Sequence, residues 1–323
     1  MRGIAEELVA LAERLNDRAL RLEAHHAMTG TMLWIGEPEA ARRHGEQGMA
    51  LYDREQHRSL AFLYGGHDPG VCCQSHSGLA LWILGYPTAA LERCREAVAV
   101  ARDLSHPYTI VNASHFSAIV DQLRGHVEAV RHLAESIISL SIEHGFQQWL
   151  AFGKVLDSWV LTEQGRSDTA IARFRGEISE YRASGTELNV PHLLALLATA
   201  HLKHGTAGEG LAVVGDALDW ADATGTHLWD SELHRLKGEL LLALDPATLP
   251  SAKIAFGKAI DIARRQSAKS WELSTATNLA RLWCDQGKRI AARDLLAPIY
   301  GWFTEGFDTT VLKEAKMLLD QLV

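Results

Sequence analysis

Apolar positions along the chain recur at helical spacing, and turn residues interrupt them at nearly constant intervals. In the run 193–198, LLALLA, apolar residues surround most of a helix, as expected where an inner helix lies between neighbouring repeats. The segment 168–182 instead keeps one polar face. We find no sustained alternation of apolar and polar residues bounded by turns, which would indicate strands. The pattern therefore predicts an all-α protein.

A turn residue separates successive helical segments at seven places. These markers are Gly36, Gly85, Gly125, Gly165, Gly205, Asp245 and Gly287. The intervals between them are 49, 40, 40, 40, 40 and 42 residues. A small residue stands seven positions before each marker, where two helices of a hairpin can approach closely: Thr29, Gly78, Ala118, Ser158, Ala198, Gly238 and Ala280. Each unit is thus predicted to be helix, tight turn, helix, and the chain a repeat array.

The repeats predict one domain, residues 1–323, that forms a tetratricopeptide (TPR)-like, right-handed superhelical solenoid. We expect an N-terminal helix in residues 1–16, about seven helical hairpins in 17–307 and a capping helix in 308–323. The longer first interval predicts an added helical turn at 60–64. Asp68, followed by Pro69, is predicted to cap a helix, and Asp308 is predicted to cap the last one.

Composition restricts the classes of partner. Hydrophobic residues make up 47% of the chain and charged residues 22%, and no apolar run approaches the length of a membrane span. The net charge of −8 gives no field that attracts polyphosphate, so we expect neither nucleic acid nor membrane as a partner. The four cysteines are unevenly spaced and the first residues lack a secretory apolar core, which favours a reducing cytoplasm.

Five stretches resemble one known family. They are 56–65 (QHRSLAFLYG), 80–87 (ALWILGYP), 232–242 (ELHRLKGELLL), 268–273 (AKSWEL) and 295–308 (LLAPIYGWFTEGFD). The resemblance is to the TPR-rich C-terminal region of multidomain bacterial proteins that carry a class III adenylate or guanylate cyclase, or another output domain, ahead of a STAND-type signalling ATPase. It covers none of the family's cyclase or ATPase motifs, so it implies a sensing or regulatory arm. Whether the chain is a standalone protein or a fragment is left open.

Catalytic motifs are not found in the sequence. The glycine-rich segment 205–210 lacks the Gly-Lys-Ser/Thr ending of a phosphate loop and follows a helix, which is typical of a hairpin turn. No Gly-x-Ser-x-Gly elbow occurs, and no predicted strand offers the paired acidic residues that a cyclase needs. We therefore predict no enzyme, no catalytic residue and no cofactor.

A metal site is considered at Cys72, Cys73 and His76, with His67 and Asp68 nearby, because zinc accepts these ligand types. Adjacent helical residues point about 100° apart, and Cys73 is better interpreted as a small buried residue near Gly78. The sequence therefore predicts no metal site.

Binding is instead predicted in the concave groove, which the first helix of each hairpin lines. The repeat register turns nine candidate residues inward: Asn112, His115, Trp149, Phe152, Trp159, His192, Trp229, Arg235 and Glu239. Large aromatic residues and arginine dominate binding hot spots. One position near the start of the first helix of a hairpin is occupied by Trp149, Trp229 and Trp271 in three repeats and by Asn189 in another. An alternative role for such tryptophans is packing between hairpins.

The predicted function is a non-catalytic protein-interaction or regulatory sensor module of a cytoplasmic signalling protein. The groove would bind a peptide or protein domain, with cyclase or ATPase domains of a parent protein among the candidates. One alternative is a small-molecule effector-binding arm that relieves autoinhibition of an output domain, and another is a structural spacer. The sequence leaves open the ligand, the oligomeric state and the regulated output.

Overall fold

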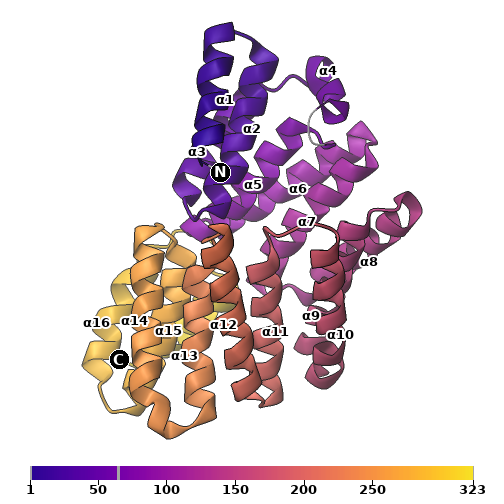
Figure 1. The fold of residues 1–323 in the computed structure, drawn as a ribbon. Coiled ribbons are helices and arrows are strands. Elements are labelled where there is room, and N and C mark those ends of the chain that lie inside the picture. The colour runs from indigo at the N-terminus through magenta and orange to yellow at the C-terminus, as the bar shows by residue number, and fades with distance from the viewer. Residues whose placement is uncertain (1, 64–65, 323) are drawn as a thin grey trace.

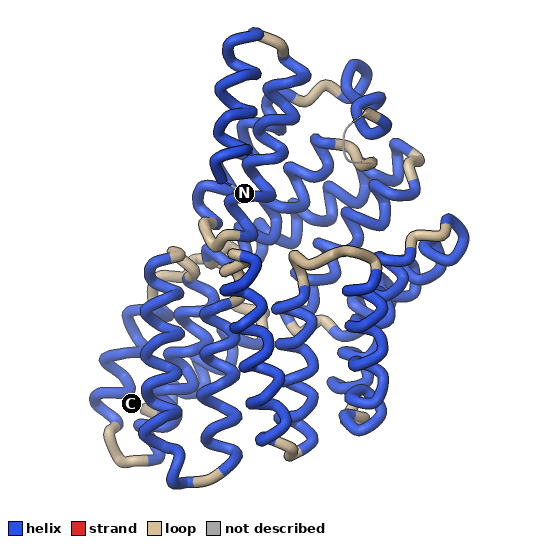
Figure 2. Tube along the Cα trace, in the orientation of Figure 1, coloured by secondary structure: helices blue, strands red, loops and turns tan. Residues whose placement is uncertain are grey.

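The computed structural model describes residues 2–63 and 66–322, and these form helices and turns without any strand (Figures 1 and 2). The α-helices are α1 (Arg2–Leu15), α2 (Arg18–Trp34), α3 (Pro38–Leu51), α4 (Arg54–His57), α5 (Pro69–Leu84), α6 (Pro87–Leu104), α7 (Pro107–Arg124), α8 (Val127–His144), α9 (Gln147–Glu163), α10 (Ser167–Ala183), α11 (Val190–His204), α12 (Ala207–Thr224), α13 (Asp230–Leu244), α14 (Leu249–Arg265), α15 (Lys269–Asp285), α16 (Arg289–Tyr300) and α17 (Thr310–Gln321). Two 3₁₀ turns, η1 (Arg58–Phe62) and η2 (Pro246–Thr248), complete the described elements.

Seven antiparallel hairpins make up the solenoid: α2–α3, α5–α6, α7–α8, α9–α10, α11–α12, α13–α14 and α15–α16. Helix α1 packs on α2 at one end. Helix α17 covers the apolar faces of α15 and α16 at the other end through Leu312, Ala315 and Leu318. The prediction of an all-α, TPR-like, right-handed superhelical solenoid is confirmed. Within the described residues no helix has both the length and the apolarity needed to cross a bilayer.

The turn markers end helices as the repeat predicts, with one exception. Gly205 takes φ +86° after α11, a left-handed conformation that other residues resist. Asp245 instead has an extended backbone (φ −161°), and its side chain accepts a hydrogen bond from the Ala247 amide to begin η2. The small residues seven positions before the markers are all buried, which agrees with close packing inside each hairpin.

The predictions for the longer first interval, near residues 60–68, and for the cap of the last helix have mixed outcomes. Asp68 does cap α5, because its Oδ1 accepts from the Val71 amide at 2.9 Å. Residues 58–62 form the expected extra turn, but Phe62 is 81% exposed, so the predicted packing of this turn is wrong for that side chain. Residues 64 and 65 lie outside the described chain. The cap predicted at Asp308 is also wrong, since Thr309 stands at the N-cap of α17.

The solenoid closes on itself between the segment after α16 and the turns around α6. Glu305 accepts hydrogen bonds through Oε1 from the amides of Thr88 and Ala89, at 2.9 and 3.0 Å, and so caps the start of α6. Buried Arg124, at the end of α7, donates to the Pro87 carbonyl at 2.7 Å and pairs with Asp308 at 2.7 Å. Asp308 therefore serves this long-range contact and not the cap of α17.

A second row of closure contacts joins α2 and α5 to the C-terminal hairpins. The Leu228 amide donates to the Trp34 carbonyl at the end of α2, at 3.2 Å. Ser270 donates its hydroxyl to the Trp82 carbonyl, and the rings of Trp82 and Trp271 lie 6.1 Å apart. The N-terminal hairpins thus rest on the turns of the C-terminal ones (Figure 1).

Candidate functional site

A pocket of about 560 Å³, here called the central pocket, opens between α1, α2, α5, α7, α9 and the turn after α10. Aromatic and aliphatic side chains form most of its wall, among them Leu20, Trp34, Tyr108, Phe116 and Trp149. Its volume lies within the range of about 300–1,000 Å³ that is typical of pockets for small ligands. The pocket therefore suits a compact ligand and is too small for a folded domain.

Four buried polar atoms on residues that line this pocket have no protein hydrogen-bond partner. They are Glu23 Oε1, His115 Nδ1, Trp149 Nε1 and Asn189 Oδ1, and their residues are between 2% and 7% exposed. An unpaired buried polar atom costs about 1–3 kcal/mol. A ligand that bonds to these atoms would recover that free energy.

The hydrogen-bonding role of His115 follows from its neighbours. With the amide oriented as observed, Asn189 Nδ2 donates to His115 Nε2 at 2.7 Å, which places the ring proton on Nδ1. Burial lowers the pKa of His115 well below its usual value, so the ring is neutral. Residues that line the pocket thus carry two unpaired donors, His115 Nδ1 and Trp149 Nε1, and two unpaired acceptors, Glu23 Oε1 and Asn189 Oδ1.

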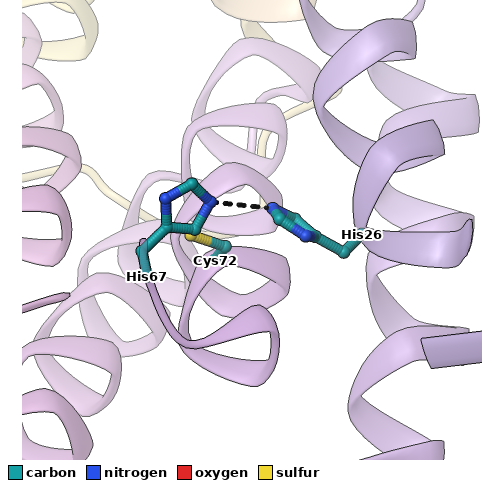
Figure 3. Close-up of side chains that lie close together, drawn as sticks. All are labelled: His26, His67 and Cys72. Carbon is teal, nitrogen blue, oxygen red and sulfur yellow. Dashed lines mark hydrogen bonds between the residues drawn. The ribbon is translucent and has the colours of Figure 1, made fainter. Parts of the chain in front are cut away.

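Two histidines and a cysteine meet in the wall of the same pocket (Figure 3). Nε2 of His26 lies 3.2 Å from Nε2 of His67, and one donor atom from each of these rings and Cys72 Sγ all lie within 4.8 Å of one another. The grouping differs from the one considered from the sequence. Cys73 packs toward Gly48 on α3, and His76 Nδ1 lies 2.8 Å from the Cys72 carbonyl.

A smaller pocket of about 300 Å³ lies between α7, α9, α11, α13 and the start of α17. His192 stacks on Trp229 with ring centroids 4.2 Å apart, and burial lowers its pKa to about 3. Arg235 pairs with Glu232 and Glu239, three residues before it and four after it on α13. These ion pairs raise the pKa of Arg235 above its usual value in spite of burial.

The nine groove candidates fall into three groups. Asn112, His115 and Trp149 line the central pocket, and Trp159, His192, Trp229 and Arg235 line the smaller one. Phe152 is fully buried, 4.2 Å from the His115 ring, and Glu239 is bonded to Arg235 and Asn278. Their role in binding remains a prediction. Trp149, Trp229 and Trp271 are almost fully buried, and their rings contact aromatic residues of neighbouring hairpins.

Sequence reasoning did not select Glu23, His26 or Tyr108. Glu23 and His26 lie on α2, 41 or more positions before His67, and no local spacing connects them with it. Tyr108 looks like an ordinary helix-start residue until its ring is seen stacked 6.2 Å from that of His67. The available signal was compositional, in the form of the adjacent histidines 25 and 26 on a predicted inner helix.

No protein-family model matches the chain. An uncharacterized protein of Rhizobium meliloti (strain 1021) is 22% identical over 240 residues, which cover 74% of this chain. The chain spans only 23% of that relative's length.

Three solved structures share the fold. The apo form of RapI has a TM-score of 0.54 and 11% identity, over 93% of this chain and 99% of that one. A Rap protein complexed with competence and sporulation factor has a TM-score of 0.60 and 16% identity, over 79% and 67%. Aspartyl phosphate phosphatase F from Bacillus subtilis has a TM-score of 0.55 and 13% identity, over 91% and 72%. At these identities the likeness shows a TPR-like helical repeat fold.

Proposed function

We propose that this chain is a non-catalytic sensor module of a cytoplasmic signalling protein, and that it binds a short peptide in the central pocket. The observation that carries the proposal is the set of four unpaired polar atoms, two donors and two acceptors, on an otherwise largely apolar wall. A peptide offers N–H and C=O groups in alternation together with apolar side chains, so it can satisfy both kinds of atom. A purely apolar ligand would leave all four unpaired.

Glu23 indicates which part of the peptide it would meet. Its Oε2 is held by His26 Nδ1 at 3.1 Å, whereas the buried Oε1 is unpaired. A buried carboxylate oxygen is best satisfied by a charged donor. The peptide's amino terminus, or a lysine or arginine side chain, is the group we assign to Glu23.

The non-catalytic role in this proposal is supported by the state of Cys72, which lies behind the histidines that line the pocket. Burial raises the pKa of Cys72 well above its usual value, so the thiol is protonated and is a poor nucleophile. His115, the buried histidine of the site, is neutral and is held by Asn189. These groups recognise a ligand without transferring a proton to it.

The comparisons support a regulatory role. One structural neighbour is a Rap protein in complex with another molecule, the competence and sporulation factor, so a solenoid of this type can hold a signalling factor. The Rhizobium meliloti relative extends well beyond the matched region. We therefore propose that peptide binding alters how this arm contacts a neighbouring output domain, for which the resemblance of the repeats suggests a cyclase or a STAND-type ATPase.

A small-molecule effector is the second candidate, and the size of the pocket is also compatible with it. A volume of about 560 Å³ suits a drug-sized ligand as well as a peptide of a few residues. Such an effector would use the same four polar atoms and would relieve autoinhibition by the same route.

The test is affinity selection followed by calorimetry on the full chain, freed of metal with a chelator. The probes are a randomised tetrapeptide library with free amino termini and the same library with acetylated ones. We expect retention of the free-amine library, and Glu23→Gln should weaken the selected peptide about tenfold or more because a charge-assisted hydrogen bond is lost. Glu7→Gln, an exposed change on α1, is the matched control.

Two outcomes would contradict the peptide proposal. One is that neither library is retained, and the other is that Glu23→Gln and wild type bind the selected peptide equally. A small molecule retained from a cell extract and lost in Glu23→Gln would instead support the effector candidate.

A further inference from the structure

We propose that His26, His67 and Cys72 form a zinc site in the wall of the central pocket. This inference goes beyond the proposed function, because the ion would be held by the protein itself whether or not a ligand occupies the pocket. It rests on the positions of three donor atoms that arrive from three separate parts of the chain: α2, the turn before α5, and the first turn of α5.

The donor distances are close to those of a zinc site. Zinc–nitrogen bonds of about 2.0–2.1 Å in tetrahedral geometry place two imidazole nitrogens about 3.3 Å apart. The observed separation of His26 Nε2 and His67 Nε2 is 3.2 Å. A zinc–sulfur bond of about 2.3 Å requires a nitrogen–sulfur separation of about 3.5 Å. All three donor atoms already lie within 4.8 Å of one another, so Cys72 Sγ needs only a small displacement.

The surrounding hydrogen bonds prepare these atoms for a cation. Glu23 Oε2 accepts from His26 Nδ1 at 3.1 Å, which leaves the Nε2 lone pair of His26 directed at the cluster. A carboxylate behind a histidine ligand is a recurrent feature of zinc sites, where it fixes the tautomer and raises the basicity of the ring. Cys72 Sγ lies 3.2 Å from Asn112 Oδ1, and rotation of that amide would turn a donor toward a metal-bound thiolate.

Burial and ligand type select the class of ion. Cys72 is fully buried, His26 has a side chain only 16% exposed, and the His67 ring is stacked on Tyr108. Two imidazoles and a thiolate suit zinc and exclude magnesium or calcium, which prefer oxygen ligands. Metal binding would also favour the thiolate of Cys72, which burial alone opposes.

The site would have one open coordination position. His26 and His67 both line the central pocket, whereas the cysteine lies behind them. Three protein ligands leave the fourth tetrahedral position for water or for a donor atom of a bound ligand. The ion would also fasten α2 of the first hairpin to α5 of the second.

Cobalt titration of the tag-free, chelator-treated full chain tests the site, with no peptide present. We expect one equivalent of Co²⁺ to produce d–d bands of tetrahedral intensity and a thiolate-to-cobalt charge-transfer band, and one equivalent of Zn²⁺ to displace it. Cys72→Ser should abolish the charge-transfer band, and His26→Gln should weaken binding at least 100-fold. Glu23→Gln should weaken it roughly 10–100-fold through loss of the carboxylate behind His26.

Matched controls separate the site from adventitious binding. Cys73→Ser changes the adjacent buried cysteine, Cys284→Ser changes the most accessible one, and His132→Gln removes an exposed histidine. All three should bind cobalt like wild type, and far-UV circular dichroism checks that each variant is folded. Absence of a stoichiometric site in wild type would overturn the proposal, and so would a charge-transfer band that survives in Cys72→Ser or is lost in Cys284→Ser. His26→Gln, on a different helix, decides the matter if Cys72→Ser does not fold.

Discussion

Gly85 and Gly205 end helices α5 and α11 in the same left-handed conformation, with φ of +97° and +86°. In each case the glycine amide donates to carbonyls three and four positions earlier. Their surroundings differ because only Gly85 lies at the closure of the superhelix. Replacing each by alanine therefore imposes the same backbone strain at both sites and a steric clash at one.

The expected magnitudes follow from the positions of the added methyl groups. A non-glycine residue in the left-handed region costs about 1–2 kcal/mol, and this is the whole penalty at Gly205, where nothing lies within 4 Å of the new Cβ. At Gly85 the new Cβ would lie 2.5 Å from Trp302 Cζ3 and 2.8 Å from Lys269 Cβ. The half-exposed Trp302 ring can turn away, whereas Lys269 Cβ moves only with the backbone of α15. Overpacking of this kind adds about 1–3 kcal/mol.

Urea unfolding and native-state hydrogen exchange measure the two effects separately. Gly205→Ala should lower the free energy of unfolding by about 1–2 kcal/mol and Gly85→Ala by about 2–5 kcal/mol. Exchange should become faster at residues 268–273 and 301–310 in Gly85→Ala alone, because these segments contact the N-terminal hairpins. Equal destabilisation by the two variants, with unchanged exchange in those segments, would show that the closure contributes nothing to stability.

Two further predictions concern buried charge. Burial lowers the pKa of His76 to about 4, of His192 to about 3, and of His115 well below its usual value. In the unfolded chain these histidines have a pKa of about 6.5, so below that pH the unfolded chain binds more protons than the folded one. The stabilisation that comes from these neutral histidines should be fully present above that pH. The free energy of unfolding should fall as pH drops toward 5, by up to about 1.4 kcal/mol per pH unit for each histidine. At lower pH the raised pKa values of Asp68 and Glu177 have the opposite effect, because the folded chain then binds more protons at these groups. Urea titrations across pH 5–7 should show a smaller slope in His192→Phe, by about one quarter at most because burial also lowers the pKa of His234 to about 4, and an unchanged slope would contradict this. Separately, Arg235→Ala should destabilise by about 1–3 kcal/mol, because it leaves Glu232 and Glu239 unpaired where their side chains are only 18% and 27% exposed. Arg131→Ala breaks the same arrangement with Glu128 and Glu135 on the exposed face of α8 and should destabilise much less in the same urea assay, so similar losses in the two variants would refute the role of burial.

The repeat architecture could be predicted from the sequence because its determinants are local. A turn glycine and a small residue seven positions earlier, such as Gly205 and Ala198, are fixed by the geometry of a single hairpin. The closure could not be predicted in this way. Glu305 caps α6 by accepting from the amide of Thr88, 217 residues earlier in the chain, and Asp308 looks like an ordinary helix cap until Arg124 is seen beside it.

The candidate site shows the same limit. The repeat register predicted that Asn112, His115 and Trp149 face inward, and these three residues line the central pocket. The register gave no information about the residues of other helices that the superhelix brings next to these side chains. His26 meets His67 only because the first two hairpins stack, and spacing along one helix cannot reveal a ligand that comes from another.

Helix α2 connects the pocket with the closure. Glu23 and His26 lie on its pocket-facing side, and the Trp34 carbonyl at its end accepts the closure hydrogen bond from Leu228. Eight residues of α-helix separate His26 from Trp34, a rise of about 12 Å, and a helix of this length moves as a rigid body. The central pocket runs along α2 from Leu20 to Trp34. A ligand or metal ion that draws α2 toward α5 and α9 would therefore also displace its Trp34 end against the turn before α13. We expect occupancy of the pocket and the tightness of the closure to be coupled through this helix, which would give the proposed sensor a physical means of changing shape.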